Sequence, residues 1–519
     1  MENENIEKKT KRKIAFGTLV GYLVLAINLL YGILITPLII SICGESDYGV
    51  YTLAVSFIAL FLVDFGLGVT ADVFLARYKA ENDTDSSNRF TSITFKLFLI
   101  LDLIFAIVFT ILYFFIEKIY VGLNYEECKL LKTMYVITSI SGLLVFPSAV
   151  FNGVLSSNED FTLIKVLTLI SRLILIVGTI ISLFTEYKII GIAFSHLISN
   201  FFILTSRFIF AKFKYKAKFN IFVKTSYSEI KPILAFSIWA AVTAIFSRLI
   251  FNIMPSVLGI TANSSEVALF GIAASLEGYI YTLSTVLNGV FLPKLYRIKE
   301  NFKDNPSLCV NEVNDLSKKV GLLQTLIILI VFIGFLTCGK EFINLWLDNR
   351  SGFYDNIFFC VILLVIYQII YTPQIIFYTY IYTQKSGIKY LGIISIVKAF
   401  INCILAFLLT IYFGALGACI SVSICRIVEL SILNILYIKK FNFDIFGWMR
   451  FIIAKTIIPF LVCLLGGLLF HFLLPLSELY KLIIIVLWDI TSFCVLFWIF
   501  IGKDYRGTYC GIFRSILKK

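Results

Sequence analysis

The chain has 519 residues, of which 59% are hydrophobic and only 15% are charged, and its mean hydropathy is +0.93. A soluble protein of this length needs far more polar surface, so the composition excludes that class. The net charge of +13 does not indicate a nucleic-acid partner, because the basic residues lie in loops between apolar segments. The sequence therefore predicts an all-α integral membrane protein.

Apolar segments of the length that crosses a bilayer, about 20 residues, recur along the whole chain. The first segment is too long for a signal peptide and has no small-residue cleavage site, so we expect it to be the first spanning helix. We predict about fourteen transmembrane helices, at residues 14–42, 48–76, 93–116, 130–155, 161–185, 188–210, 232–258, 267–292, 319–338, 357–383, 388–413, 416–437, 451–474 and 481–502.

Lys and Arg are distributed unevenly over the connections between these helices. Thirty fall on the side that carries both termini, and seven fall on the opposite side. Because cytoplasmic loops carry the excess of basic residues, both termini are predicted to lie in the cytoplasm. We expect a multi-pass protein of the bacterial cytoplasmic membrane.

An internal repeat is visible as residue pairs that share one offset. Pro147 and Pro373 are 226 positions apart, as are Arg172 and Lys398, and Gly49 and Gly271 are 222 apart. Six helices return the chain to its starting side, so the two halves are predicted to be parallel, with substrate between them. The predicted parts are a basic tail (1–13), a first six-helix lobe (14–210), a basic linker (211–231), a second six-helix lobe (232–437), two extra helices (451–502) and a basic tail (503–519).

The opening hairpin carries a recognisable pattern. Pro37 is followed by D-Y-G-V-Y at 47–51 and by D-F-G-L-G at 64–68. This pattern resembles the Wzx-type polysaccharide flippases of the multidrug/oligosaccharidyl-lipid/polysaccharide (MOP) exporter superfamily. The resemblance covers essentially the whole chain. It implies that the substrate is an undecaprenyl-pyrophosphate-linked oligosaccharide, moved to the outer leaflet by alternating access for surface polysaccharide of the O-antigen or capsule type.

Charges at membrane depth are costly and usually face a cavity or a partner. Arg172 and Lys398 each lie about 16 Å into their helices, at 1.5 Å per residue, and they are equivalent in the repeat. We predict that they bind the pyrophosphate, since Arg is a fork donor to phosphate. The alternative is that each pairs with a carboxylate on a neighbouring helix.

Two further cations are candidates for the substrate cavity. Arg248 lies in the outer half of the seventh helix, and first helices of each repeat line the cleft in the family that the chain resembles. Arg426 has Glu429 three residues further on, which puts both on one helix face. An intrahelical pair of Arg426 with the counter-ion Glu429 is the alternative role.

Two acids at depth complete the candidate site. Asp64 lies in the second helix and Glu277 in the eighth. Both are predicted to be counter-ions of the cations, or sites where Na⁺ or H⁺ couples transport to a gradient. Asp489, on the last helix, lies outside the repeat, and we expect a structural or peripheral role for it.

No catalytic, nucleotide-binding or metal-binding motif is present. The sequence has no P-loop, no H-E-x-x-H and no G-x-S-x-G, and its 11 Cys and two His form no ligand cluster. We therefore predict a protein that is not an enzyme and has no cofactor or metal. Its expected partners are a lipid-linked oligosaccharide, membrane lipids and polysaccharide polymerase or assembly proteins.

Three other functions compete with a polysaccharide flippase. A drug/cation antiporter of the same superfamily predicts twelve helices and an acidic cavity. A lipid II flippase shares topology and chemistry with the leading hypothesis. A membrane-embedded glycan polymerase or ligase is disfavoured by the internal repeat, because a transporter needs two halves that rock and an enzyme does not.

Overall fold

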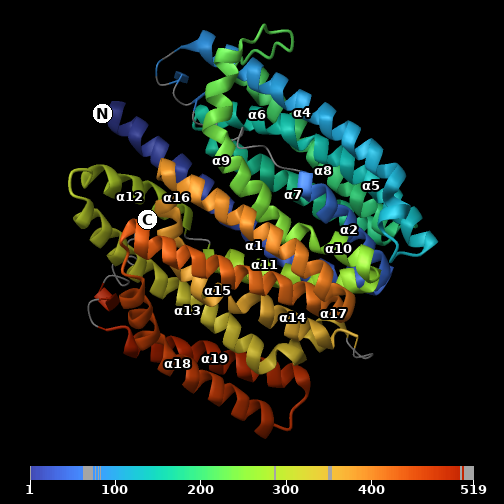
Figure 1. Ribbon diagram of the computed structural model, residues 1–519, viewed down its shortest axis with the longest axis vertical. Coiled ribbons are helices and arrows are strands. Elements are labelled where there is room, and N and C mark those ends of the chain that lie inside the picture. The colour runs from blue at the N-terminus through green and yellow to red at the C-terminus, as the bar shows by residue number, and fades with distance from the viewer. Residues whose placement is uncertain are drawn as a thin grey trace. The chain divides into compact units, whose positions relative to one another are not determined.

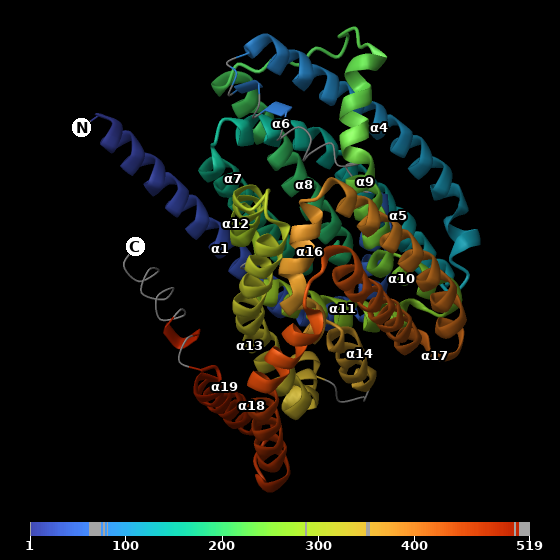
Figure 2. The same ribbon diagram turned by 60° about the vertical axis from the view of Figure 1, so that its left-hand side comes forward.

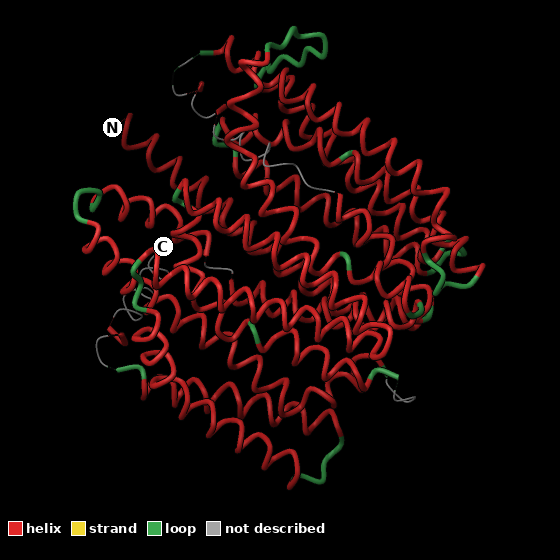
Figure 3. Tube along the Cα trace, viewed as in Figure 1, coloured by secondary structure: helices red, strands yellow, loops and turns green. Residues whose placement is uncertain are grey.

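The computed structural model describes residues 2–61, 74–75, 78–79, 81, 83–285, 288–348, 353–502 and 505–507. Its described part consists of helices and their connections, with no strand (Figure 3). Chain packing divides it into two compact units. Unit 1 comprises residues 1–271 and 406–414, and unit 2 comprises residues 272–405 and 415–519. The predicted lobes, 14–210 and 232–437, stay a prediction.

The helices of unit 1 occupy the blue-to-green part of the chain in Figure 1. Their bounds are α1 Glu2–Cys43, α2 Glu45–Phe61, α4 Thr84–Ile119, α5 Tyr125–Leu143, α6 Val145–Ser157, α7 Phe161–Leu183, α8 Lys188–Ile209, α9 Tyr227–Asn252, α10 Met254–Thr261 and α11 Ser264–Thr285, which continues past the boundary at Gly271. A short π-helix, Phe210–Lys214, extends α8.

The helices of unit 2 follow in yellow to red, and α18 and α19 run side by side in both views (Figures 1 and 2). Their bounds are α12 Asn288–Asn301, α13 Pro306–Leu347, α14 Asp355–Ile366, α15 Gln368–Tyr371, a 3₁₀ turn Thr372–Gln374, α16 Ile375–Tyr382, α17 Lys385–Phe441, α18 Ile445–Leu473 and α19 Glu478–Phe500. Its buried aromatic core gathers around Phe377 and Trp448.

Among the described residues, 11 helices are long and apolar enough to cross a membrane, or 12 if the bent pair α9–α10 is one span. The class predicted from composition is therefore confirmed, while the count of fourteen stays a prediction. One reason for the lower number is α17, which has 57 residues and would measure about 85 Å if straight. It contains two of the predicted spans.

The turn within α17 falls at Gly414, whose φ of +51° and ψ of −130° are not helical. A left-handed φ favours glycine because it has no Cβ. The two arms fold back on each other, since Ser421 Oγ donates to Asn402 Oδ1 at 2.9 Å. Gly414 thus ends the predicted span 388–413 and begins the return.

The two repeat-related prolines interrupt corresponding spans. α5 and α6 meet at Leu144, three residues before Pro147, and the 3₁₀ turn between α15 and α16 holds Pro373. Proline has no N–H and its ring crowds the carbonyl four residues earlier, which breaks the helix. Each of the two spans is therefore interrupted at or near its proline.

Three helices begin at least nine residues earlier than predicted, and α1, which begins at Glu2 instead of residue 14, is one of them. α4 starts at Thr84, where Asp83 accepts a hydrogen bond from the Ser86 N–H at 2.9 Å, and α13 starts at Pro306 after the capping residue Asn305. The predicted starts at 93 and 319 were wrong because polar helical turns outside the bilayer carry no hydropathy signal. The linker lies over the extension of α4: Ser92 Oγ donates to the carbonyl oxygen of Lys218 at 3.1 Å.

The glycine of the D-Y-G-V-Y motif makes a close helix crossing. A Cβ at Gly49 on α2 would overlap the carbonyl oxygen of Ser264 on α11, and one at Gly271 would lie 2.7 Å from Thr52 Cγ2. Glu127 fixes the same crossing, since its carboxylate accepts hydrogen bonds from Ser46 and Ser264. The repeat-related glycines thus pack α2 and α11 against each other.

We expect Gly49→Ala to destabilise the protein by about 1–3 kcal/mol, because the added methyl forces apart a contact made through backbone. Gly278→Ala is the matched control, since nothing lies within 4 Å of the corresponding Cβ. Thermal unfolding of both variants in detergent measures the difference. Equal midpoints for the two variants would contradict this account of the crossing.

A second fixed point lies between α6 and α7. Asp160 accepts hydrogen bonds from Tyr215 and from Lys214 Nζ, the latter at 2.5 Å. Burial alone would raise the pKa of Asp160, but these hydrogen bonds outweigh it, so its pKa is lowered. The segment after α8 is thereby tied to the start of α7.

This lowered pKa sets the sign of a pH effect. The contribution of Asp160 to stability is fully present above its unfolded pKa, about 3.9, and is lost as the pH falls through the lower folded value. Because half of the Lys214 side chain is exposed, we expect Asp160→Asn to cost less than about 1 kcal/mol. Unfolding midpoints of wild type and variant should differ at neutral pH and converge in acid; a constant gap would argue against the ion pair.

Candidate functional site

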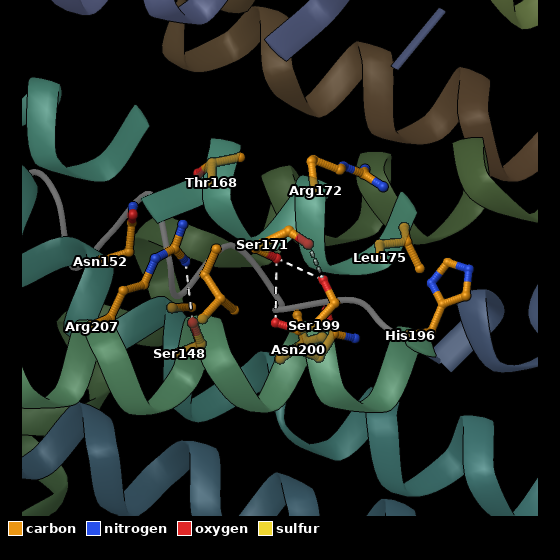
Figure 4. Close-up of a pocket in the computed structure, with 13 residues that line it drawn as sticks. Ser148, Asn152, Thr168, Ser171, Arg172, Leu175, His196, Ser199, Asn200 and Arg207 are labelled. Atoms are coloured by element: carbon orange, nitrogen blue, oxygen red, sulfur yellow. Dashed lines mark hydrogen bonds between the residues drawn. The ribbon is translucent and has the colours of Figure 1, made fainter. Parts of the chain in front are cut away.

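A polar cavity of about 600 Å³ lies within unit 1, among α6, α7 and α8 (Figure 4). Figure 4 shows Arg207 toward one end and His196 toward the other, with Ser171 and Ser199 between them. The described lining consists of Val145, Ser148, Ala149, Asn152, Thr168, Ser171, Arg172, Leu175, His196, Ser199, Asn200, Ile203 and Arg207.

Small residues set the spacing of α7 and α8 beside this cavity. Ser171 and Ser199 share a hydrogen bond of 2.7 Å between their hydroxyls. A Cβ at Gly178 or Gly191 would come within 3 Å of a serine on the other helix. Membrane helices approach closely where such residues meet. The longer polar side chains of the same helices then line the space beside α6.

Arg207 is the more firmly held of the two cavity arginines. Its Nη1 donates to Ser148 Oγ at 3.1 Å, and its buried Nε has no hydrogen-bond partner among the described residues. The buried Oδ1 of Asn152 also has none. The cavity therefore holds a donor and an acceptor with hydrogen-bonding capacity that the described chain does not use.

The described lining contains two arginines and no Asp or Glu. Two cations without an acid give the described lining a positive charge, so this cavity favours an anion and disfavours a cation. Arginine forks suit phosphate and carboxylate groups, and the surrounding hydroxyls and amides suit sugar hydroxyls. The described lining therefore offers hydrogen-bonding groups for an anion and for hydroxyl groups.

His196 connects the cavity to the opening hairpin. Its Nε2 lies 3.0 Å from the Tyr51 hydroxyl, within the D-Y-G-V-Y motif on α2. This contact makes His196 an interhelical hydrogen-bonding residue that also lines the cavity. The motif thus has a structural link to the candidate site.

Lys398, the repeat partner of Arg172, has a different environment in unit 2. Its Nζ lies 2.6 Å from Glu429 Oε1, and the two side chains are 3% and 7% exposed. Arg426 Nη1 lies 3.6 Å from Glu429 Oε2, and its guanidinium stacks over the Tyr367 ring at 5.3 Å. The three charges join the two arms of α17. Lys398 pairs with a carboxylate on the other arm, and Arg426 pairs with Glu429 on its own arm.

Glu277 belongs to the same charge network. Its Oε1 accepts a hydrogen bond from Gln368 Nε2, and it interacts electrostatically with Arg426. Within this network the charges of two cations, Lys398 and Arg426, balance those of two carboxylates, Glu429 and Glu277. This balance contrasts with the carboxylate-free lining of the described cavity in unit 1.

The remaining predicted residues do not join either group. Arg248 lies on α9 with an exposed side chain and does not line the cavity. Asp64 lies outside the described residues. Arg172 and Lys398 belong to different units, so the predicted clamp across the cleft stays a prediction. Their proposed contact with substrate is likewise untested.

Arg207 was not predicted. It lies three residues before the end of the predicted span 188–210, where a basic residue is usually interfacial. The available signal was its helix spacing: Arg207 follows Ser199 by eight residues and Asn200 by seven, which places all three on one helix face. A search for polar residues at that spacing on α8 identifies the cavity face.

Known proteins share this fold. Residues 14–299 match the family model described as polysaccharide biosynthesis protein, and no curated protein matches the chain significantly. A solved structure of the lipid II flippase MurJ, in an inward closed conformation, is similar with a TM-score of 0.71 and 19% identity, over 96% of this chain and 100% of that one.

Two further solved structures are similar. An inward-facing multidrug resistance MATE transporter of the MOP superfamily has a TM-score of 0.64 and 16% identity, over 82% of this chain and 94% of its own. A MOP superfamily transporter from Pyrococcus furiosus, for which a reverse polarity of the binding pocket is described, has a TM-score of 0.51 and 14% identity, over 83% and 97%. The chain belongs to the polysaccharide biosynthesis protein family and has the fold of the MOP superfamily transporters.

Proposed function

We propose that this protein is a flippase that moves an undecaprenyl-pyrophosphate-linked oligosaccharide from the cytoplasmic to the outer leaflet, for surface polysaccharide of the O-antigen or capsule type. Family membership and the MOP fold support a flippase. The observation that supports an anionic substrate is the cavity lined by Arg172 and Arg207, whose described lining contains no carboxylate.

The chemistry of the cavity suits both parts of such a headgroup. The arginines bind the pyrophosphate, while Asn152, Asn200 and the serines bind sugar hydroxyls. A volume of about 600 Å³ lies within the range of small-molecule sites and holds the phosphates with the first sugars. The lipid tail stays in the bilayer, because lipid solvates its apolar surface. Only the polar headgroup can form hydrogen bonds and ion pairs in this cavity.

The energy source and surroundings follow from the same proposal. The sequence holds no nucleotide-binding motif, so we assign the driving force to an ion gradient, with Glu277 as a site for H⁺ or Na⁺. Lys398, Arg426 and Glu429 hold unit 2 together and contribute charge near that site. We place the protein in the bacterial cytoplasmic membrane with both termini in the cytoplasm, alongside polysaccharide polymerase or assembly proteins.

One alternative has specific support. A lipid II flippase would use the same phosphate chemistry, and the solved lipid II flippase has a similar fold over nearly the whole chain. A drug/cation antiporter is disfavoured, because a cationic drug would meet two arginines and no acid in the described cavity lining.

Deletion in the native host separates these functions. A polysaccharide flippase predicts loss of the surface polysaccharide and build-up of its lipid-linked unit. A lipid II flippase predicts build-up of lipid II with lysis, and an antiporter predicts drug sensitivity with intact surface glycan. Either of the last two outcomes would refute the proposed substrate.

A further inference from the structure

The two extra helices, α18 and α19, contact α13 at a place outside both the cavity and the charge network of α17. α18 and α19 pack against each other, and both pack against α13 (Figures 1 and 2). At this junction α13 departs from helical geometry at Cys338, with φ −137° and ψ 19°. Three apolar helices thus converge where one of them is kinked.

A buried carboxylate lies at the kink. Asp489 on α19 is 1% exposed, and its Oδ2 accepts a hydrogen bond from Thr337 Oγ1 at 2.9 Å. Its Oδ1 has no hydrogen-bond partner among the described residues. A Cβ at Gly467 on α18 would lie 3.0 Å from that oxygen and 2.7 Å from Thr337 Cγ2. Gly467 therefore lets α18 close directly over the acid.

A second carboxylate, Glu341, lies beyond the kink at Cys338, four residues after Thr337 on α13. His471 follows Gly467 by four residues on α18, so these two share a helix face. Glu341 Oε1 lies 2.9 Å from His471 Nδ1, and Glu341 Oε2 is buried with no hydrogen-bond partner in the described chain. Glu341 is 8% exposed as a residue, while the His471 side chain is 27% exposed.

The other charged and titratable groups of these helices do not compensate the two acids. Lys340 turns to α14, with its Nζ 5.6 Å from the centre of the Phe358 ring. Glu478, at the start of α19, accepts a hydrogen bond from Asn344. Two further titratable neighbours are the thiols of Cys338 and Cys463, which interact electrostatically with Asp489. No Lys or Arg ion pair reaches Asp489 within the described part of the chain.

The chemistry of such a cluster is specific. His471 Nδ1 lies 2.9 Å from Glu341 Oε1, which makes the two an ion pair when the imidazole is protonated, and Nδ1 has no hydrogen-bond partner among the described residues. Two carboxylates with unused oxygens in an apolar core carry a large desolvation cost, which a bound proton removes. The partly exposed position of His471 opens the cluster toward the end of the bundle where α18 and α19 are connected.

We propose that Asp489 and the Glu341–His471 pair form a proton-binding site that fastens α18 and α19 to α13. With the proton bound, the carboxylates do not repel and the three helices close. After its loss, the like charges of Asp489 and Glu341 drive α18 and α19 away from α13. This site is independent of the proposed transport substrate.

Infrared titration of the full-length protein in lipid nanodiscs tests the site. The wild type should show a protonated-carboxyl band that disappears as the pH rises. Asp489→Asn should remove most of that band. His471→Gln should shift its midpoint by about one pH unit, a tenfold change in proton affinity, because a neighbouring charge is lost. Glu478→Gln, on the same helix, should change nothing.

Unfolding midpoints provide a second readout. The wild type should become less stable as the pH rises through the titration, and Asp489→Asn should be insensitive to it. If Asp489→Asn does not fold, Thr337→Val, which removes the donor to Asp489, should raise the pH at which the band disappears. A band that persists in Asp489→Asn, or one that follows sodium concentration at fixed pH, would overturn the proposal.

Discussion

Replacing Arg172 and Arg207 together by alanine is expected to abolish export of the lipid-linked oligosaccharide at a normal protein level. The double variant removes both arginines of the described cavity lining. A hydrogen bond to a charged group contributes about 1.5–3 kcal/mol, so each arginine accounts for roughly 10- to 100-fold in affinity. Surface polysaccharide and the accumulated lipid-linked unit, measured in a complemented deletion strain, report the loss.

The matched controls separate charge, fork geometry and folding. Lysine at either position keeps the charge but loses the bidentate donor, so each Arg→Lys variant should export at an intermediate rate. Lys129→Ala removes an exposed cation outside the cavity and should export normally. Normal export by the double alanine variant, at wild-type protein level, is incompatible with an arginine-lined binding site.

Lys398→Met is expected to destabilise the protein strongly. It leaves Glu429 as a buried carboxylate without its partner at 2.6 Å, and breaking a buried pair in this way costs about 3–5 kcal/mol. Arg426, at 3.6 Å from the other oxygen of Glu429, compensates part of the charge, which places the effect at the lower end of that range. Thermal unfolding in detergent, with the yield of monodisperse protein, measures it.

The second-site variant shows which role Lys398 has. Lys398→Met with Glu429→Gln removes the unpaired charge and should recover most of the lost stability. If the stable double variant also exports, Lys398 supports the structure of unit 2; if it is stable but inactive, Lys398 contributes to transport directly. Unchanged stability of Lys398→Met alone would contradict the buried ion pair.

Hydropathy predicted most of the architecture because the bilayer imposes one length and one polarity on every span. It failed at the starts of α4 and α13, where polar helical turns outside the membrane are fixed by capping residues and by the linker after α8. The turn at Gly414 lies between the predicted spans 388–413 and 416–437. Hydropathy separated these spans because an apolar stretch of this length is too long to cross the membrane once.

The candidate site was predicted only in part. Depth in a helix singled out Arg172, because a cation at the centre of a span needs a cavity or a partner. Depth could not distinguish those two outcomes, and Lys398 has a partner 31 residues away on the returning arm of α17. Arg207 lies too near the end of its span to stand out, and the contact of Glu341 with His471 depends on how α13 and α18 pack.

The assignment of residues 406–414 to unit 1, while the rest of α17 belongs to unit 2, has a consequence for covalent connectivity. The polypeptide passes between the units three times, after residues 271, 405 and 414. A protease cut at any one of these passages leaves the two units tethered by the others. A fragment that ends at residue 271 lacks residues 406–414 of unit 1, whereas the fragment 272–519 holds all of unit 2, so the first fragment should not be stable when it is expressed without the second.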